Sequence, residues 1–346
     1  MTLEDAQRLW QPETLYLNTA SYGLPPTPAW EELQSVLGDW RGGRTSWEGW
    51  GDYTERARAS FARMVNVPVE WVATGANASS MVGLAAAAPP DGSRVVSTEL
   101  EFTSLLWPFL AQGRRIEVEC VPVPDVAQSV DERTGVVAVS LVQSSTGELA
   151  DLDAIVDAAA AHGAWVVVDA TQACGWLPVD ANRIDLMACS AYKWLCSPRG
   201  TAFMTVRPEL AERLTPLAAG WYAGEDPYAS FYGPPLRLAK DARRFDLSPA
   251  WFPWAGTAPA LDVLLDIGVE AIHEHDLRLA NRFREGLGLP PGDSAIVSAE
   301  LPEAEERLRG TRVVMAAARA GLLRTSWHVY NTDDDVDELL RLLGRA

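Results

Sequence analysis

Apolar residues along the first two thirds of the chain occur in two patterns, as short continuous runs and at positions spaced as on one helix face. The short runs are rich in β-branched residues and predict strands at 70–74, 94–100, 114–123, 135–142, 165–170, 184–191 and 201–207. Helical spacing marks residues 151–164, which Asp151 leads and Gly163 ends, and an Ala-rich helix is expected after Asn77. The run 165–170 is apolar on both faces, as in a central parallel strand. This alternation predicts an α/β fold with a mainly parallel sheet covered by helices on both faces.

The pattern changes at about residue 217. Residues 217–256 are rich in Gly, Pro and aromatic side chains, which is typical of long functional loops. A helix is expected from Ala260, opening a smaller α/β unit, and an amphipathic helix with acidic residues at its start is expected from Asp333. The predicted organisation is an N-terminal arm over 1–25, a large domain over 26–245 and a small C-terminal domain over 246–346.

Composition limits the partners that the chain could have. With 48% apolar and 22% charged residues it is typical of a globular protein, and a net charge of −18 argues against nucleic acid or an anionic membrane as main partner. We expect no membrane helix and no export signal, because no apolar run is long enough and the first residues lack a basic region before an apolar one. The four cysteines form no Cys-x-x-Cys pair and no metal-like cluster with histidine. A reducing cytoplasm is therefore expected, with the cysteines as small buried packing groups.

Tryptophan is unusually frequent, with 14 residues in the chain, seven of them before residue 110. Packing at a subunit interface and an aromatic substrate pocket both account for this enrichment. The segment 40–50 adds Arg41 and Arg44 beside Trp47 and Trp50. It is interpreted either as a loop at a dimer interface or as a contact for a large or anionic substrate group.

The candidate chemistry centres on Asp169 and Lys193. Asp169 ends a predicted central strand and so lies at the carboxyl edge of the sheet, where α/β folds bind ligands, although alone it could equally cap the segment after it. The interval to Lys193 has room for one more strand, which returns both side chains to the same edge. A lysine condenses with an aldehyde, and a carboxylate facing a ring nitrogen keeps that nitrogen protonated. The pair therefore predicts a site for an aldehyde cofactor.

The segments VVVDATQACGWLPVD and CSAYKWLCSPRGTAFMTVRPEL resemble the class V aminotransferase family, the fold-type I enzymes that use pyridoxal 5′-phosphate. The resemblance runs from YLNTASYGLPP near the N-terminus to RTSWHVYNTDDDVDELL near the C-terminus. It implies a large cofactor-binding domain, a smaller C-terminal α/β domain and a homodimer. The cofactor residues that it implies are Lys193 as the aldimine lysine, Asp169 at the pyridine nitrogen, Gln172 at the phenolic oxygen, Phe102 stacked on the ring, and Ala76, Asn77, Ser190 and Tyr192 around the phosphate.

The same resemblance implies a site for an amino-acid substrate. Arg324 matches the arginine that holds the substrate's α-carboxylate, and Asn18 to Ser21, with Ala20, match the arm that closes over the substrate. The chain departs from the family pattern in two places. Ser144 stands where relatives commonly have Asn, and Leu247-Ser248 replaces a Gly-Thr pair that lends a phosphate donor across the dimer.

The resemblance implies a reaction at the α-carbon of an amino acid, and several outcomes are open. A desulfurase needs a cysteine nucleophile late in the chain, and the last cysteine is Cys196. The sequence looks most similar to hercynylcysteine sulfoxide lyase and related C–S lyases, so the expected reaction is β-elimination from an S-substituted cysteine or its sulfoxide through a quinonoid. Amine transfer and epimerisation are the alternatives, and a homologue that binds a ligand without catalysis is a further hypothesis.

Overall fold

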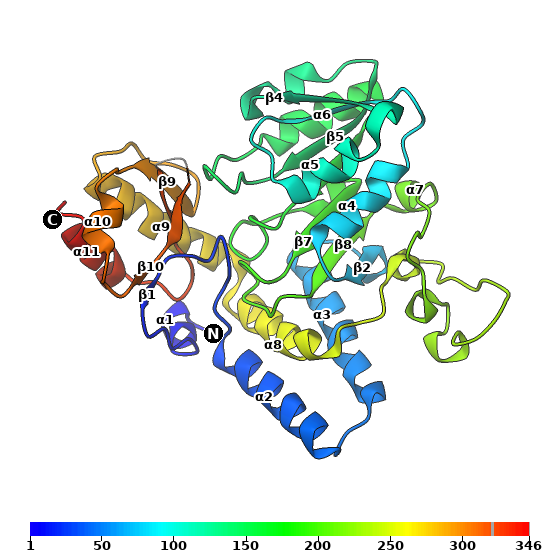
Figure 1. Ribbon diagram of the computed structural model, residues 1–346, viewed down its shortest axis with the longest axis horizontal. Helices are drawn as coiled ribbons and strands as arrows, with labels where there is room; N and C mark the ends of the chain where they lie inside the picture. The colour runs from blue at the N-terminus through cyan, green and yellow to red at the C-terminus, as the bar shows by residue number, and fades with distance from the viewer. Residues whose placement is uncertain (320–321, 346) are drawn as a thin grey trace.

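A computed structural model describes residues 1–319 and 322–345. Residues 320, 321 and 346, which belong to the expected small domain, lie outside the described part. Figure 1 shows a large body built on a sheet, a smaller body that contains the C-terminus, and the N-terminal arm running between them. The arm contains α1 (Leu3–Gln7) and β1 (Leu15–Tyr16).

The large body contains a seven-stranded sheet of order β2-β8-β7-β6-β5-β3-β4. Its strands are β2 (Val72–Gly75), β3 (Arg94–Thr98), β4 (Glu117–Val121), β5 (Thr134–Ser140), β6 (Trp165–Asp169), β7 (Leu186–Ser190) and β8 (Ala202–Val206). Only β8 runs antiparallel to its neighbours within this sheet. The expected mainly parallel α/β sheet is therefore confirmed.

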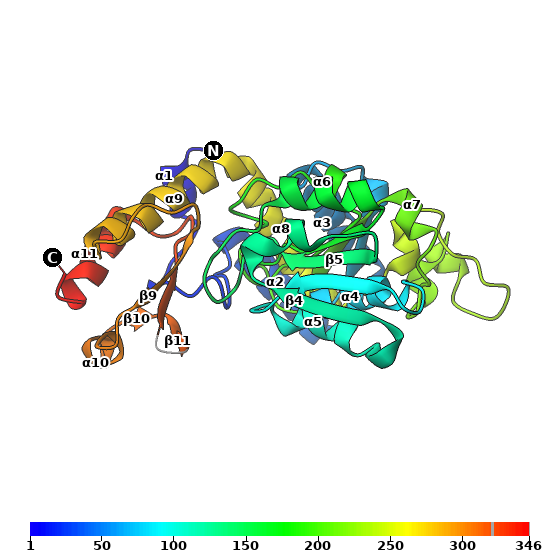
Figure 2. The same ribbon diagram turned by 90° about the horizontal axis from the view of Figure 1, so that it is seen from above.

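Helices cover both faces of this sheet. Side chains alternate along β5, so that Val137 and Val139 face one hydrophobic cluster while Val136 and Ala138 face another. The first cluster includes residues of α3 (Gly51–Met64), α6 (Leu152–His162) and α8 (Trp251–Ile267), and the second includes residues of α4 (Ala78–Ala87), α5 (Thr103–Leu110) and α7 (Pro208–Ala211). Figure 2 shows α6 on the opposite side of the sheet from α4 and α5.

The helix at 151–164 ends as its sequence predicts. The Asp151 side chain accepts a hydrogen bond from the Ala154 amide at 3.0 Å, which satisfies a donor of the first turn. Gly163 ends the helix in the left-handed conformation with φ of 70°. Local capping chemistry therefore sets both ends of α6, directly before the strand that carries Asp169.

The small body is an antiparallel sheet of order β11-β12-β9 with helices packed on it. Its elements are α9 (Val269–Gly286), β9 (Ile296–Glu300), α10 (Ala304–Leu308), β11 (Ala316–Arg319), β12 (Leu322–Ser326) and α11 (Asp333–Leu342), and the short β10 (Val313–Val314) pairs with β1 of the arm. The terminal helix starts at Asp333 as expected, and Thr332 forms a capping box with Asp335.

Sequence predictions differ from the structure in several places. The strand predicted over 114–123 is limited to Glu117–Val121, with 3₁₀ turns on either side. Glu70 lies in a 3₁₀ turn, and β2 begins only at Val72. Cys120 is exposed, so its assignment as a buried packing group was wrong, whereas the other three cysteines are buried. The helix expected from Ala260 begins at Trp251, because tertiary packing extends it past the loop-like composition of its first turn. No helix in the described part of the chain has the length and apolarity needed to cross a bilayer.

Helix α8 packs against α2 (Thr27–Gly42) and α3 of the large body. The chain then turns at Gly268, whose φ of 93° favours glycine, and α9 starts the small body. We therefore propose that the boundary between the two domains lies near Gly268 rather than at residue 246.

The Trp-rich segment packs against the loops after residue 217. The Trp47 ring lies 5.5 to 6.3 Å from the rings of Trp221, Tyr228, Phe231 and Trp251. Arg44 forms an ion pair with Asp39 at 2.9 Å on the exposed surface, and so pairs locally. Aromatic packing within the chain therefore accounts for Trp47, and a contact of this segment with substrate stays a prediction.

A buried ion pair ties β2 to the segment before α8. Arg58 and Asp246 lie 2.7 Å apart with their side chains 2% and 0% exposed. Arg58 also donates to the Val72 carbonyl at 2.6 Å, and the Asp246 carboxylate accepts from the Thr74 amide at 2.7 Å. The pair thus fixes the strand that leads to Ala76 and Asn77.

Replacing Arg58 with Ala should lower the free energy of unfolding by about 3–5 kcal/mol, because Asp246 is left buried without its cation. Arg56→Ala is the matched control, since Arg56 is on the same helix as Arg58 and pairs with Asp262 of α8, but its side chain is 54% exposed. Its cost should be about 0–1 kcal/mol. Urea unfolding measures both values, and equal losses would contradict the assignment of Arg58 as a structural anchor.

Candidate active site

Asp169 and Lys193 meet at the carboxyl edge of the sheet. Strand β6 ends at Asp169, which is in register with Ala188 of the parallel strand β7. Strand β7 ends at Ser190, and the chain turns there, so Lys193 follows within three residues of the same edge. Both side chains are 5% exposed. The parallel register therefore brings together the two groups that the sequence singled out.

Opposing interactions act on the pKa of the buried Asp169 carboxyl group. One oxygen accepts from the Thr171 amide at 2.8 Å. Burial raises the pKa of Asp169, while the hydrogen bonds from Thr171 and the charge of Lys193 act to lower it. Because burial disfavours the bare anion, a protonated ring nitrogen facing this oxygen would be strongly favoured as its partner.

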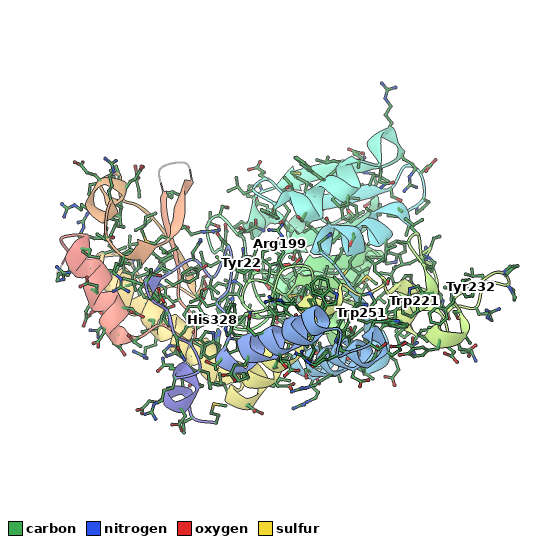
Figure 3. The ribbon with its side chains drawn as sticks, turned by 60° about the horizontal axis from the view of Figure 1, so that its bottom comes forward. Tyr22, Arg199, Trp221, Tyr232, Trp251 and His328 are labelled. Carbon is green, nitrogen blue, oxygen red and sulfur yellow. The ribbon has the colours of Figure 1, made fainter. Side chains whose placement is uncertain are left out.

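Two aromatic rings lie beside the amine of Lys193. The Phe102 ring centroid is 5.2 Å from Nζ and the Tyr192 centroid is 5.8 Å away. The Arg199 guanidinium lies 4.8 Å from the same Tyr192 ring, and Figure 3 shows Arg199 beside Tyr22. Phe102 thus lies where a planar cofactor held by Lys193 could stack on it. Whether the Tyr192 hydroxyl reaches a phosphate stays a prediction.

Lysine is scarce in this chain, which contains only Lys193 and Lys240. Lys240 is 87% exposed and lies 3.3 Å from Glu225. An aldehyde cofactor therefore meets just one buried lysine, and that lysine lies at the sheet edge beside Asp169.

The residues expected to hold a phosphate lie at the N-terminus of α4. The Asn77 side chain accepts from the Ser80 amide at 2.9 Å and so caps the helix, while Ala76 and Asn77 are exposed. The Ala78 amide donates to the Ser190 hydroxyl at 3.1 Å, which joins the two elements that the sequence assigned to phosphate. Amides at a helix start attract an anion, so the placement is compatible with the expected role, which stays a prediction. The sequence reasoning missed the bond from the Ala78 amide to Ser190.

Arg324 is brought together with two of the residues expected to surround the substrate. It is 2% exposed, and its guanidinium donates to the Ser144 carbonyl, to the Ser144 hydroxyl at 3.3 Å and to the Ser21 hydroxyl at 2.8 Å. Burial with hydroxyl partners orients the planar fork and supports its proposed role toward a carboxylate.

The N-terminal arm lies between Arg324 and Lys193. Asn18 forms a bridge with Ser326 on β12, and the Ala20 amide donates to the Ser326 hydroxyl at 3.1 Å. The Gly23 amide donates to the Tyr192 carbonyl at 2.9 Å, and a Cβ at Gly23 would lie only 1.9 Å from the Lys193 carbonyl oxygen. The arm therefore touches both bodies at the points where their functional side chains are attached.

The Gln172 amide links the arm to the segment after Lys193. Its Nε2 donates to the Ala20 carbonyl at 2.9 Å, and its Oε1 accepts from the Trp194 indole at 2.7 Å. The amide keeps a second N–H, so the proposed bond to the cofactor's phenolic oxygen is compatible with both contacts. Ser248 is exposed beside Leu247, whose amide donates to Thr74, and its expected role across a dimer stays a prediction.

Glu101 is a site residue that the sequence reasoning missed. Its buried carboxylate accepts from the Phe102 amide at 2.7 Å, the Ser140 amide at 2.8 Å and the Gln143 side chain at 3.2 Å. These bonds fix the backbone at Phe102, the ring expected to stack on the cofactor. A glutamate directly before that ring in TELEF was the available signal.

A model of the family described as Aminotransferase class-V matches residues 40–307. The chain belongs to this family. An uncharacterized aminotransferase of Bacillus subtilis is 28% identical over 84% of this chain and 83% of its own length, and isopenicillin N epimerase of Streptomyces clavuligerus is 28% identical over 82% of both. The expected family and the fold-type I architecture are confirmed, whereas a particular closeness to hercynylcysteine sulfoxide lyase is not.

Solved structures agree with the fold. A cystine C–S lyase in complex with cysteine persulfide has a TM-score of 0.85 at 20% identity and covers 96% of this chain and 97% of its own. The cysteine desulfurase CsdA of Escherichia coli has a TM-score of 0.84 at 20% identity, over 100% and 98% of the two chains.

Pyridoxal 5′-phosphate is the cofactor of this class V chain. The described residues fit it: an amine for the aldehyde on Lys193, an acid for the ring nitrogen on Asp169, an apolar ring for stacking on Phe102, and exposed helix-start amides for the phosphate. The groups suited to the cofactor's aldehyde, ring nitrogen, ring face and phosphate thus all lie at the carboxyl edge of the same sheet.

Borohydride reduction of the protein loaded with cofactor should attach one cofactor to the peptide that contains Lys193. Lys193→Ala should abolish this adduct, because no other buried lysine is available. Lys240→Ala is the matched control and should leave the adduct unchanged. Peptide mass spectrometry checks both variants, and an adduct that persists in Lys193→Ala would overturn the assignment.

Proposed function

We propose that this class V enzyme is a C–S lyase that carries out β-elimination on an S-substituted cysteine or its sulfoxide. The observation that carries the proposal is the convergence of Lys193, Asp169 and Arg324 without an accessible cysteine near them. Such a site can activate an amino acid, yet it offers no thiol to take up the sulfur.

The cysteines argue against the desulfurase alternative. Cys196 is the last cysteine in the chain and is fully buried, with its Sγ directed at the Trp194 carbonyl at 3.8 Å. A sulfur acceptor must be accessible and able to form a thiolate. Cys120 is exposed, but it lies on the edge strand β4, which β3 and β5 separate from β6, and partial burial together with the charge of Glu101 raises the pKa of its thiol. The sulfur is therefore expected to leave as a small thiol or sulfenate instead of being transferred to the protein.

Each of the three residues has a role in elimination. Arg324 binds the α-carboxylate and so orients the Cα–H bond toward Lys193. The Nζ of Lys193 accepts the α-proton, the Cβ–S bond breaks with its electron pair leaving on sulfur, and the released unsaturated amine hydrolyses to pyruvate and ammonia. When bound, pyridoxal 5′-phosphate delocalises the charge left at the α-carbon, and Asp169 favours this by keeping the ring nitrogen protonated.

Epimerisation is the second candidate, supported by the similarity to isopenicillin N epimerase. It differs from elimination in returning the proton to the α-carbon instead of expelling the sulfur. Amine transfer, the third outcome, requires a keto acid as acceptor.

S-alkyl-L-cysteines and their sulfoxides should give pyruvate and a sulfur product in equal amounts when incubated with the loaded enzyme. Lactate dehydrogenase coupling measures the pyruvate and a thiol reagent measures the thiol, with Lys193→Ala as the inactive control. Formation of the D-enantiomer, or of glutamate when 2-oxoglutarate is added, with no pyruvate would contradict the lyase proposal.

Arg324→Lys should raise the KM for the same amino acids by about 10- to 100-fold, because a single ammonium replaces a planar fork that binds a carboxylate with two bonds. Arg312→Lys, at an exposed position before β10, should leave KM unchanged. Steady-state kinetics checks this, and an unchanged KM in Arg324→Lys would remove Arg324 from the substrate site.

A further inference from the structure

A buried imidazole connects the small body to the backbone beside Lys193. His328 follows β12 and is 0% exposed, as is Asp276 on α9. The Nδ1 of His328 lies 2.9 Å from the Asp276 carboxylate, and its Nε2 lies 3.0 Å from the Trp194 carbonyl. Figure 3 shows His328 between the small body and the sheet of the large body.

We propose that His328, held by Asp276, is a positioning residue that fixes the Lys193 segment relative to the substrate arginine Arg324. The inference depends on Lys193 being the cofactor lysine, but not on which reaction follows. His328 lies four residues after Arg324 and touches the residue after Lys193, so one short stretch of chain couples the two sites.

His328 is the stronger of two donors to the Trp194 carbonyl, since the other is the weakly donating Cys196 thiol at 3.8 Å. This carbonyl is buried, and a buried carbonyl without a donor is costly. Gly175, with φ of 110°, approaches the same oxygen so closely that a Cβ there would lie 2.4 Å away. The Trp194 and Tyr330 rings lie edge-on to the imidazole at 5.2 and 5.5 Å, which leaves His328 in a tightly defined orientation.

The protonation of His328 supports a role in holding two segments together. Both partners of the ring are oxygen acceptors, a carboxylate and a carbonyl, so both ring nitrogens donate when the imidazole is charged. Burial opposes that charge, but Asp276 and Cys196 outweigh burial and raise the pKa of His328 to about 10. The other Asp276 oxygen has no hydrogen-bond partner among the described residues, so this costly buried pair is poorly explained by stability alone.

Two substitutions separate the two bonds. In His328→Gln the amide can reproduce the Nε2 donor to Trp194 while the bond to Asp276 is lost, whereas in His328→Asn the shorter amide can reproduce the Nδ1 donor and loses Trp194. His328→Gln should be the less stable of the two by thermal unfolding, because it leaves the Asp276 carboxylate buried without a partner. His328→Asn should be the more impaired in function.

Two measurements test function. The first is the rate of covalent cofactor capture by Lys193, monitored by absorbance. The second is hydrogen exchange of residues 191–197 before the cofactor is added. His328→Asn should slow capture by about 10-fold or more, because the Lys193 amine is no longer held in the orientation needed to attack the aldehyde. Hydrogen exchange of residues 191–197 should become faster, because the segment has lost a restraining bond. His328→Gln should remain within about threefold of the unaltered chain, because the amide N–H keeps a donor on the Trp194 carbonyl, although this neutral bond is weaker than one from a charged imidazole. With any accepted substrate, kcat should fall in His328→Asn while KM changes little.

His275→Gln is the matched control. His275 is also buried on α9 and contacts the Asn331 carbonyl at 3.0 Å, and among the described residues none of its hydrogen bonds reaches residues 191–197. Capture and exchange should be normal in this variant. Equal behaviour of His328→Asn and His328→Gln, or an effect that simply follows their thermal stability, would overturn the positioning role. A failure of the lyase assay alone would not affect these readouts.

Discussion

The arm approaches the backbone of Lys193 closely, and much of the site depends on this contact. Gly23 lies so near the Lys193 carbonyl that no larger residue fits there without displacing one of the two segments. Because Asn18 and Ala20, a few residues earlier, are bonded to β12, this contact sets the distance between the body that holds the cofactor lysine and the body that holds Arg324. Backbone approach of this kind is rigid, since it has no rotamers to relax.

Local pattern predicted the parts of the molecule that short-range chemistry decides. The strands of the parallel sheet, both ends of α6 and the capped terminal helix each follow from a few neighbouring residues. Asp169 and Lys193 could be paired because parallel register returns successive strand ends to one edge. The roles of Phe102, Ser190 and Arg324 came from family resemblance and stay predictions. The structure places Phe102 beside Lys193, Ser190 beside the first turn of α4 and Arg324 beside Ser21.

What could not be predicted depends on tertiary contacts across long separations. The start of α8 and the domain boundary follow from packing on α2 and α3, which no window of sequence contains. His328 and Asp276 are 52 positions apart, and each alone resembles an ordinary polar residue in a helix or a loop. Glu101 stands directly before Phe102 in the sequence, but its bonds to Ser140 and Gln143 join it to a segment 39 to 42 positions later, which local pattern does not reveal.

The scarcity of lysine has a consequence for how the aldehyde reaches its place. Aldehydes condense with any unprotonated primary amine, so a lysine-rich surface would hold much of the reagent in unproductive adducts. Here the positive surface groups are almost all guanidinium groups, which do not deprotonate near neutral pH, and Lys240 is the one exposed ε-amine. The amino-acid composition of the whole surface therefore helps to direct the aldehyde to Lys193, in addition to the residues around that lysine.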